Sequence, residues 1–305
     1  MASFAADIYK PNFFIVGAPK CGTTSLNYYL QQHPNIFMAK KELYFFGSDF
    51  TFREGPTELD YYLSFFKNAK RNQLIGEASV WYLFSKKAAA EIKKFNKQAK
   101  ILIMLRSPVD MLYSLHSEQL FNGNENIDSF EEAIKAETKR KKGELIPPYI
   151  GCPIEALQYR QIGKYYQQVK RYIDKFGKEQ VHIIFMNDFA NNTEMEFTKV
   201  LNFLDLATVD EFDFEVKNTN KKSKNEKLRD ILKSRPTALK RIAKAIIPVR
   251  NWRHKLTEKL WELNTINTNR IPINEETKTK LNKYFEPDIL KLQELIGKDL
   301  GYWLK

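Results

Sequence analysis

Continuous apolar runs recur along the first two thirds of the chain, with helical patterns between them. A parallel strand that is covered on both faces is apolar along its whole length. The runs predicted to be strands lie at 13–16, 100–105 and 181–186 and at 74–79, which ends in polar residues, with a short extended piece at 36–38. The helical patterns lie at 25–32, 60–66, 86–95, from Pro108 onward, and at 129–142, 154–176 and 193–204. This alternation predicts an α/β fold with three layers, α/β/α, and a central parallel sheet like that of P-loop proteins.

The loop after the first apolar run is the strongest sign of a binding site. Four apolar residues lead into Gly17, and Pro-Lys-Cys-Gly-Thr-Thr-Ser follows at 19–25. Gly22 lets the backbone approach a ligand closely, and three hydroxyl residues stand where a helix would begin. Together with the ammonium of Lys20 and the positive end of the helix, these groups favour a phosphate or a sulfate. The alternative is a glycine turn with nothing bound.

This loop departs from the pattern of nucleotide triphosphatases. Their loop ends in Gly-Lys-Ser/Thr, whereas Thr23 follows Gly22 here and the lysine stands at position 20. The difference argues against a simple ATP or GTP hydrolase.

Two further clusters of polar residues border the predicted strands. Arg106 ends the third run, and Ser114 stands about two turns into the helix that Pro108 opens; the pair suits a second phosphate, or else Arg106 makes a structural ion pair. Glu42 precedes the aromatic run Tyr44-Phe45-Phe46. A carboxylate beside aromatic bulk gains proton affinity, as a general base requires, unless Glu42 forms only a surface ion pair.

Composition limits the domain count and the cellular compartment. The 305 residues contain neither an internal repeat nor a Gly/Ser/Pro linker, so we expect one domain over 1–305. Two cysteines suit a reducing compartment, and the chain shows no signal peptide or membrane span, which together predict a cytoplasmic protein. The four histidines show no ligand spacing, so no metal is expected.

A basic helical segment at about 217–263 carries the charge excess. Residues 217–255 hold fourteen Lys or Arg and two acidic residues, which equals the net charge of +12. This segment suits an anionic cofactor, an acidic glycan or an anionic membrane, or is simply a solvated face. Nucleic acid is not favoured, because aromatic residues are not interleaved with the basic ones. An apolar stripe within 235–263 suits peripheral membrane contact, although a lid over the cofactor would show the same pattern.

The motifs together resemble those of sulfotransferases that use 3′-phosphoadenosine 5′-phosphosulfate (PAPS). The loop at 19–25 resembles their 5′-phosphosulfate loop, and Arg106-x-Pro108 with Ser114 resembles their 3′-phosphate motif. Glu42-x-x-Phe45-Phe46 is similar to the segment that carries the catalytic base in heparan sulfate sulfotransferases. The tail at 267–303 resembles the closing segment of bacterial sulfotransferases, with Arg270 in the loop that returns to the 3′-phosphate, so the likeness covers residues 12 to about 303.

The resemblance implies an enzyme that transfers a sulfuryl group from PAPS to an acceptor hydroxyl, with an amine as the less favoured alternative, and releases 3′-phosphoadenosine 5′-phosphate (PAP). Glu42 is implied as the base and Lys20 as the group that neutralises the bridging oxygen. Because some cytosolic relatives use a histidine base, His116 is the alternative base. The implied cofactor contacts are Lys20, Cys21, Gly22, Thr23, Thr24 and Ser25 at the 5′ end, Arg106, Ser114 and Arg270 at the 3′-phosphate, and Tyr165 at the adenine.

The acceptor is less well defined than the cofactor. Gly76-Glu77-Ala78-Ser79 stands where the glycan enzymes have Glu-Lys-Thr, and Ala78 removes a lysine that contacts their substrate, which argues against a heparan-type acceptor. A glycan, a glycolipid or a small alcohol is expected. Two other classes stay open: a P-loop kinase that uses ATP with Mg²⁺, and a non-catalytic binder of anionic ligands.

Overall fold

The computed structural model describes residues 9–50, 55–148, 150–209, 212–215, 220–234 and 249–305. The chain divides into two compact units. The first comprises residues 1–112, 160–218 and 275–305, and the second comprises 113–159 and 219–274. The single domain expected over 1–305 stays a prediction.

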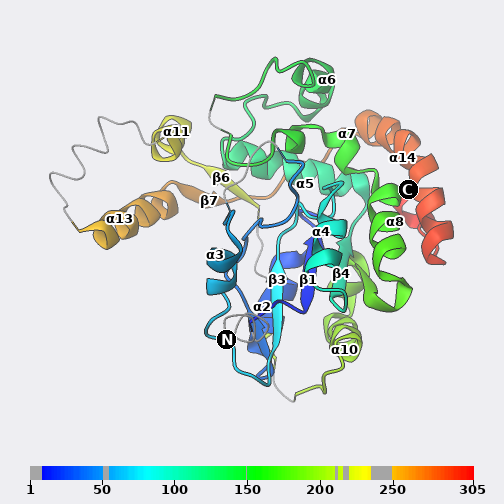
Figure 1. The fold of residues 1–305 in the computed structure, drawn as a ribbon. Coiled ribbons are helices and arrows are strands. Elements are labelled where there is room, and N and C mark those ends of the chain that lie inside the picture. Colours follow the sequence, from blue (N-terminus) through cyan, green and yellow to red (C-terminus); the bar gives the residue numbers. More distant parts are fainter. Residues whose placement is uncertain (1–8, 51–54, 149, 210–211, 216–219, 235–248) are drawn as a thin grey trace. The chain divides into compact units, whose positions relative to one another are not determined.

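The first unit is built on a five-stranded parallel sheet in the order β2-β3-β1-β4-β5 (Figure 1). The strands are β1 (Phe13–Gly17), β2 (Ile36–Met38), β3 (Leu74–Ala78), β4 (Lys100–Leu105) and β5 (Val181–Phe185). All residues of β1 are buried, as expected for a central strand with both faces covered. The predicted α/β fold with a central parallel sheet is confirmed.

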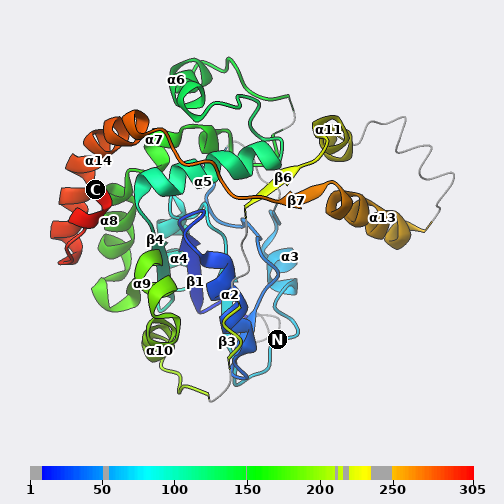
Figure 2. The same cartoon turned by 180° about the vertical axis from the view of Figure 1, so that it is seen from behind.

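Helices cover both faces of this sheet. Those on the face turned to the viewer in Figure 1 are α4 (Ala88–Phe95) and α8 (Tyr165–Phe176). Those on the opposite face, in front in Figure 2, are α2 (Thr23–Gln32), α9 (Met186–Asn191) and α10 (Thr193–Phe203). The first unit also contains α3 (Leu59–Ser64), α14 (Glu275–Ile296), the short helices η2 (Lys178–Gln180) and η3 (Gly301–Leu304), most of α7 (Tyr159–Ile162), and the start of α5 (Pro108–Phe121).

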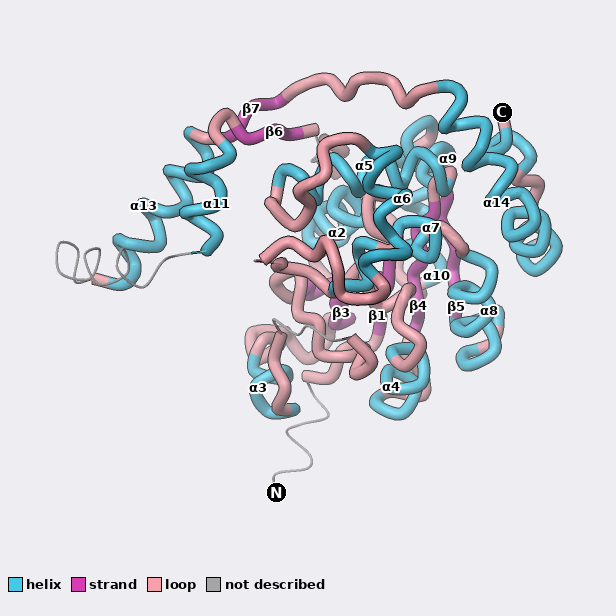
Figure 3. Tube along the Cα trace, turned by 90° about the horizontal axis from the view of Figure 1, so that it is seen from above, coloured by secondary structure: helices cyan, strands magenta, loops and turns pink. Residues whose placement is uncertain are grey.

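The strand order places β1 and β4 side by side, and Figure 3 shows both in the row of strands. From β1 the chain leaves toward β2, whereas from β4 it leaves toward β5 on the other side. Ligands of open α/β sheets bind at the carboxyl ends of the strands where the direction reverses in this way. The amide of Ala18 donates to Met104 O at 2.7 Å, so the loop after β1 adjoins the end of β4.

The second unit is mainly helical and contains one antiparallel strand pair. Its elements are the rest of α5, α6 (Phe130–Arg140), η1 (Ile154–Leu157), β6 (Lys221–Ser223), α11 (Glu226–Ser234), α13 (Arg250–Leu263) and β7 (Thr265–Asn267). A buried carboxylate, Glu125, accepts hydrogen bonds from Arg140 Nη1 at 2.7 Å and from the hydroxyl of Tyr159 at 2.9 Å. These bonds fasten α6 to the chain that follows α5.

Two predicted elements differ from the structure. The prediction of a single helix over 154–176 is wrong. The structure has η1, α7 and α8 there, and the helical path is interrupted at Gly163. A Cβ at Gly163 would lie 2.7 Å from the ring of Phe285, so the backbone approaches α14 more closely than a side chain permits. The stretch between the predicted strand at 181–186 and the predicted helix at 193–204 contains a further helix, α9. Residues 235–248 of the basic segment, which include most of the apolar stripe, lie outside the described residues.

Candidate active site

The loop between β1 and α2 has two residues in the left-handed backbone region. Lys20 has φ 59° and Gly22 has φ 90°. A left-handed backbone is uncommon for a residue with a side chain, and it turns successive amides toward one concave surface. Gly22 is the N-cap of α2 and has no side chain with which to bond the first amides of the helix. The first amides of α2 are thus left for another acceptor, and an anion bound to this loop stays a prediction.

Lys41, to which the sequence assigned no role, extends onto this helix terminus. Its Nζ donates to Thr23 Oγ1 at 2.9 Å and to Thr24 Oγ1 at 3.2 Å. The N-terminus of a helix carries partial positive charge, so a cation placed there is stabilised when an anion lies close by. Lys41 directly precedes the Glu42-x-x-Phe45-Phe46 motif, but its partners lie 17 and 18 residues earlier in the chain, and no local pattern pairs them.

Glu42, the predicted base, lies beside that ammonium. Its Oε1 is 3.6 Å from Lys41 Nζ, and both side chains are 18% exposed. The aromatic run after Glu42 packs into the unit: Phe45 stacks on Tyr62 with ring centroids 4.2 Å apart, and Phe46 is buried. The structure thus brings the base and the anion loop of the prediction together through Lys41.

Cys21 is a buried residue of the loop, and the charges of both predicted cations affect the pKa of its thiol. The side chain is fully buried, and burial raises the pKa of Cys21 to about 12. A hydrogen bond with Tyr165 and the charges of Arg106 and Lys20 oppose this rise. Lys20 and Arg106, from the ends of β1 and β4, therefore both lie within electrostatic range of one sulfur atom.

Arg106 and Tyr165 differ in how open their surroundings are. The Arg106 side chain is 24% exposed, and its Nε lies 3.8 Å from Asp110 Oδ2. Tyr165 is fully buried, with its hydroxyl 3.9 Å from Cys21 Sγ and its ring edge-on to Trp303. The contact of Tyr165 with an adenine stays a prediction.

In the second unit, Arg270 and Ser114 meet as the motif implied. Arg270 Nη2 donates to Ser114 Oγ at 3.1 Å, and its Nε donates to Ser117 Oγ at 3.1 Å. Nη2 also lies 3.2 Å from Asn220 Oδ1. Sequence reasoning missed Ser117 and Asn220. The spacing of Ser117, three residues after Ser114 on the same helix face, was an available signal, whereas Asn220 had none.

His116, the alternative base, belongs to the core of the second unit. It is 2% exposed, its Nε2 lies 2.9 Å from Ile127 O, and its ring packs against Phe130 and Tyr159. Burial lowers the pKa of His116. A ring held this way is poorly placed to receive a proton from an acceptor in solution.

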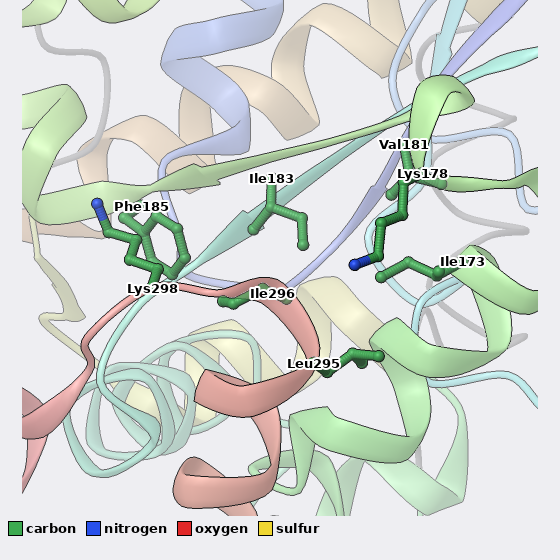
Figure 4. Close-up of a pocket in the computed structure, with 8 residues that line it drawn as sticks. All are labelled: Ile173, Lys178, Val181, Ile183, Phe185, Leu295, Ile296 and Lys298. Atoms are coloured by element: carbon green, nitrogen blue, oxygen red, sulfur yellow. The ribbon is translucent and has the colours of Figure 1, made fainter.

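A pocket of about 240 Å³ lies elsewhere in the first unit, along the edge strand β5 (Figure 4). Its lining includes Ile183, Phe185, Ile296 and Lys298, and none of the predicted site residues.

Among the described residues there is no group of three His, Cys, Asp or Glu that could hold a metal ion. Within that part of the chain, no helix combines the length and apolar character needed to cross a bilayer.

Comparison with known proteins identifies the family. Residues 10–265 match the family model described as a sulfotransferase domain. This chain belongs to the sulfotransferase family. The family membership inferred from the motifs is thereby confirmed. A solved sulfotransferase structure has a similar fold. The crystal structure of a sulfotransferase from Alicyclobacillus acidocaldarius superposes with a TM-score of 0.73 at 28% identity, covering 97% of this chain and 99% of that one.

Named members of the family are more distant in sequence. Membrane-associated sulfotransferase kil1 of Dictyostelium discoideum is 24% identical over 281 residues, covering 68% of this chain and 59% of its own. Carbohydrate sulfotransferase 15 of Rattus norvegicus is 28% identical over 254 residues, covering 66% and 45%. The heparan sulfate glucosamine 3-O-sulfotransferase 5 of Mus musculus is 26% identical, covering 64% and 54%. This chain thus spans about half the length of these relatives.

Proposed function

We propose that this chain transfers a sulfuryl group from PAPS to an acceptor hydroxyl. The observation that carries the proposal is that Lys41 connects two predicted parts, the anion loop and the base, at the N-terminus of α2. The loop of Lys20 and Gly22 forms one side, Lys41 bonds the hydroxyls of the first helical turn, and the Glu42 carboxylate stands 3.6 Å from Lys41. An anion site, cations and a base are the parts that transfer of an anionic group to a hydroxyl requires.

The residues at this terminus fit the 5′ end of PAPS. The amides of the first turn have no side-chain cap at Gly22, and Lys20 and Lys41 provide positive charge. We assign the amides and hydroxyls of residues 21–25 to the 5′-phosphate. The two ammonium groups are assigned to the charge on the transferred group and on the leaving oxygen, with Lys20 at the bridging oxygen.

The motif implies Arg106, Ser114 and Arg270 as the contacts of the 3′-phosphate, and each stays a prediction. In the first unit, Arg106 offers a partly exposed guanidinium at the end of β4. In the second unit, Arg270 and the hydroxyls of Ser114 and Ser117 form one cluster of donors. Guanidinium and hydroxyl donors are the usual partners of phosphate oxygens.

PAPS, when bound, supplies the sulfuryl group, and the chain supplies positioning and proton transfer. Glu42 accepts the proton of the acceptor hydroxyl as the oxygen attacks. The burial of His116 in the second unit favours Glu42 as the base.

For the acceptor, we propose a carbohydrate hydroxyl. Support comes from the relatives named carbohydrate sulfotransferase and heparan sulfate glucosamine 3-O-sulfotransferase. Position 78, where the resemblance expects a substrate-contacting lysine, holds a buried alanine, so we do not propose a heparan-type acceptor. The cytoplasmic location expected from the sequence stays a prediction.

Calorimetry tests the cofactor. PAP should bind at least about 10-fold more tightly than ATP with Mg²⁺, a difference of about 1.4 kcal/mol. Tighter binding of ATP would support a kinase instead. Lys20→Ala should lower turnover by about two orders of magnitude or more, the scale of losing an oxyanion donor; unchanged turnover would remove Lys20 from the mechanism.

An acceptor screen tests the reaction. Radiolabelled PAPS is offered with neutral and acidic glycans, glycolipids and small alcohols, and the label should appear on a carbohydrate. Binding of PAP without transfer to any member of the panel would instead support a non-catalytic binder.

A further inference from the structure

Glu77, at the end of β3, is a buried carboxylate that the proposed chemistry does not use. It is 1% exposed and accepts three hydroxyl hydrogen bonds. Ser79 Oγ donates at 2.6 Å, the hydroxyl of Tyr62 at 2.7 Å and that of Tyr82 at 2.9 Å. Burying a carboxylate is costly, and three charge-assisted bonds offset that cost.

Two of these hydroxyls also hold the backbone that follows Glu42. Ser79 Oγ accepts from the amides of Leu43 at 3.2 Å and Tyr44 at 3.1 Å, and the hydroxyl of Tyr82 accepts from the amide of Phe46 at 3.3 Å. Tyr44 has φ 51°, a left-handed conformation that a tyrosine adopts only when its surroundings impose it. The bonded amides therefore hold a strained turn directly after the base.

The direction of each hydroxyl proton links the two sets of bonds. A hydroxyl has one proton and two lone pairs. Because Ser79 and Tyr82 give their protons to Glu77, their lone pairs face the amides of the loop. An ionised carboxylate accepts only, so it orients both hydroxyls as acceptors for residues 43–46.

We propose that Glu77 is a positioning residue for Glu42. By orienting the hydroxyls of Ser79 and Tyr82, it holds the turn after Glu42 and so keeps that carboxylate beside Lys41 at the N-terminus of α2. Glu77 itself is buried and touches no reacting group. This inference rests on the proposed role of Glu42 as the base.

The cluster contains its own matched control. Ser79→Ala and Tyr82→Phe each remove one donor to Glu77 together with an acceptor for the loop amides. Tyr62→Phe also removes one donor to Glu77, but the Tyr62 hydroxyl bonds none of these loop amides, and the ring that stacks on Phe45 stays. A general loss of stability would follow from all three variants, whereas loss of positioning would follow only from the first two.

The measurements are hydrogen exchange of the peptide covering 41–47, PAP affinity and kcat for transfer from radiolabelled PAPS. All are taken below the lowest melting temperature of the set. Ser79→Ala and Tyr82→Phe should speed exchange and lower kcat by about 10- to 100-fold, since a displacement of about 1 Å has effects of this size, with PAP affinity unchanged. Tyr62→Phe should match the wild type in exchange and kcat. If Ser79→Ala fails to fold, Tyr82→Phe and Glu77→Gln answer the same question.

Each alternative outcome is decisive. Unchanged exchange in Ser79→Ala and Tyr82→Phe, or equal losses of kcat in these variants and in Tyr62→Phe, would overturn the positioning role. Faster exchange with full activity in Ser79→Ala, together with full activity in Glu42→Gln, would overturn the role of Glu42 as base. The inference would then fail through the proposed function and not through the contacts around Glu77.

Discussion

Lys41 offers the sharpest test of the site, because sequence analysis gave it no role and the structure places it between the anion loop and the base. The perturbation is Lys41→Met, which keeps most of the side-chain length and removes the charge. The ammonium makes bonds of 2.9 and 3.2 Å to Thr23 and Thr24 and is only 18% exposed, so water replaces it poorly. Hydrogen bonds from charged donors contribute about 1.5–3 kcal/mol each.

Only the part of this interaction that strengthens in the transition state affects kcat. Loss of one preorganised donor near developing charge costs about 2.7–4 kcal/mol, and we take the lower end because Lys41 is not fully buried. Lys41→Met should then lower kcat by about 100-fold, since about 1.36 kcal/mol corresponds to each factor of ten. PAP lacks the sulfuryl group, so its affinity should fall by less than kcat does.

The assay is transfer from saturating radiolabelled PAPS to the acceptor found in the screen, with PAP affinity measured by calorimetry. Lys40→Met is the matched control, because it removes the charge of an exposed lysine one position earlier. We expect Lys40→Met to resemble the wild type. A kcat for Lys41→Met within about threefold of the wild type would refute the reasoning, since that difference is only about 0.65 kcal/mol.

Three further predictions concern the base, a thiol and a buried ion pair. Glu42→Gln should lower kcat by about 100-fold or more, whereas His116→Gln should lower the melting temperature and retain kcat; the reverse result would make His116 the base. Because burial raises the pKa of Cys21 to about 12, its thiol should not react with Ellman's reagent at pH 8 until the protein unfolds, and rapid labelling of the folded protein would contradict this burial. The pKa of Glu125 would rise on burial, but hydrogen bonds from Arg140 hold it below its usual 4.5, so the pair stabilises the fold above that pH and the contribution is lost as the pH falls through the lowered pKa. Urea titrations from pH 7 downward should show that loss in the wild type, and Arg140→Met should be destabilised by about 3–5 kcal/mol at pH 7; equal stability of the two proteins at pH 7 would disprove it.

The elements that sequence analysis predicted best are those whose pattern has one cause. A strand covered on both faces is mostly apolar, so 100–105 was predicted with the bounds that β4 has. The region 154–176 was predicted worst, because its apolar spacing continues through Gly163 although the helix does not. At the break the backbone of Gly163 packs against Phe285, more than a hundred residues later, which no local window contains.

The sequence by itself determined the family and the reactive groups that the protein contains. These groups are a glycine loop with a lysine, an arginine that ends a strand, and a carboxylate before an aromatic run. These are properties of short segments, in which neighbouring residues share one backbone and the spacing decides what they can do. Only the tertiary structure decided which side chains meet. Lys41 bonds the first turn of α2, and Glu77 orients the hydroxyls that hold the turn after Glu42, because the sheet places β3 beside β1 and brings distant loops to one edge.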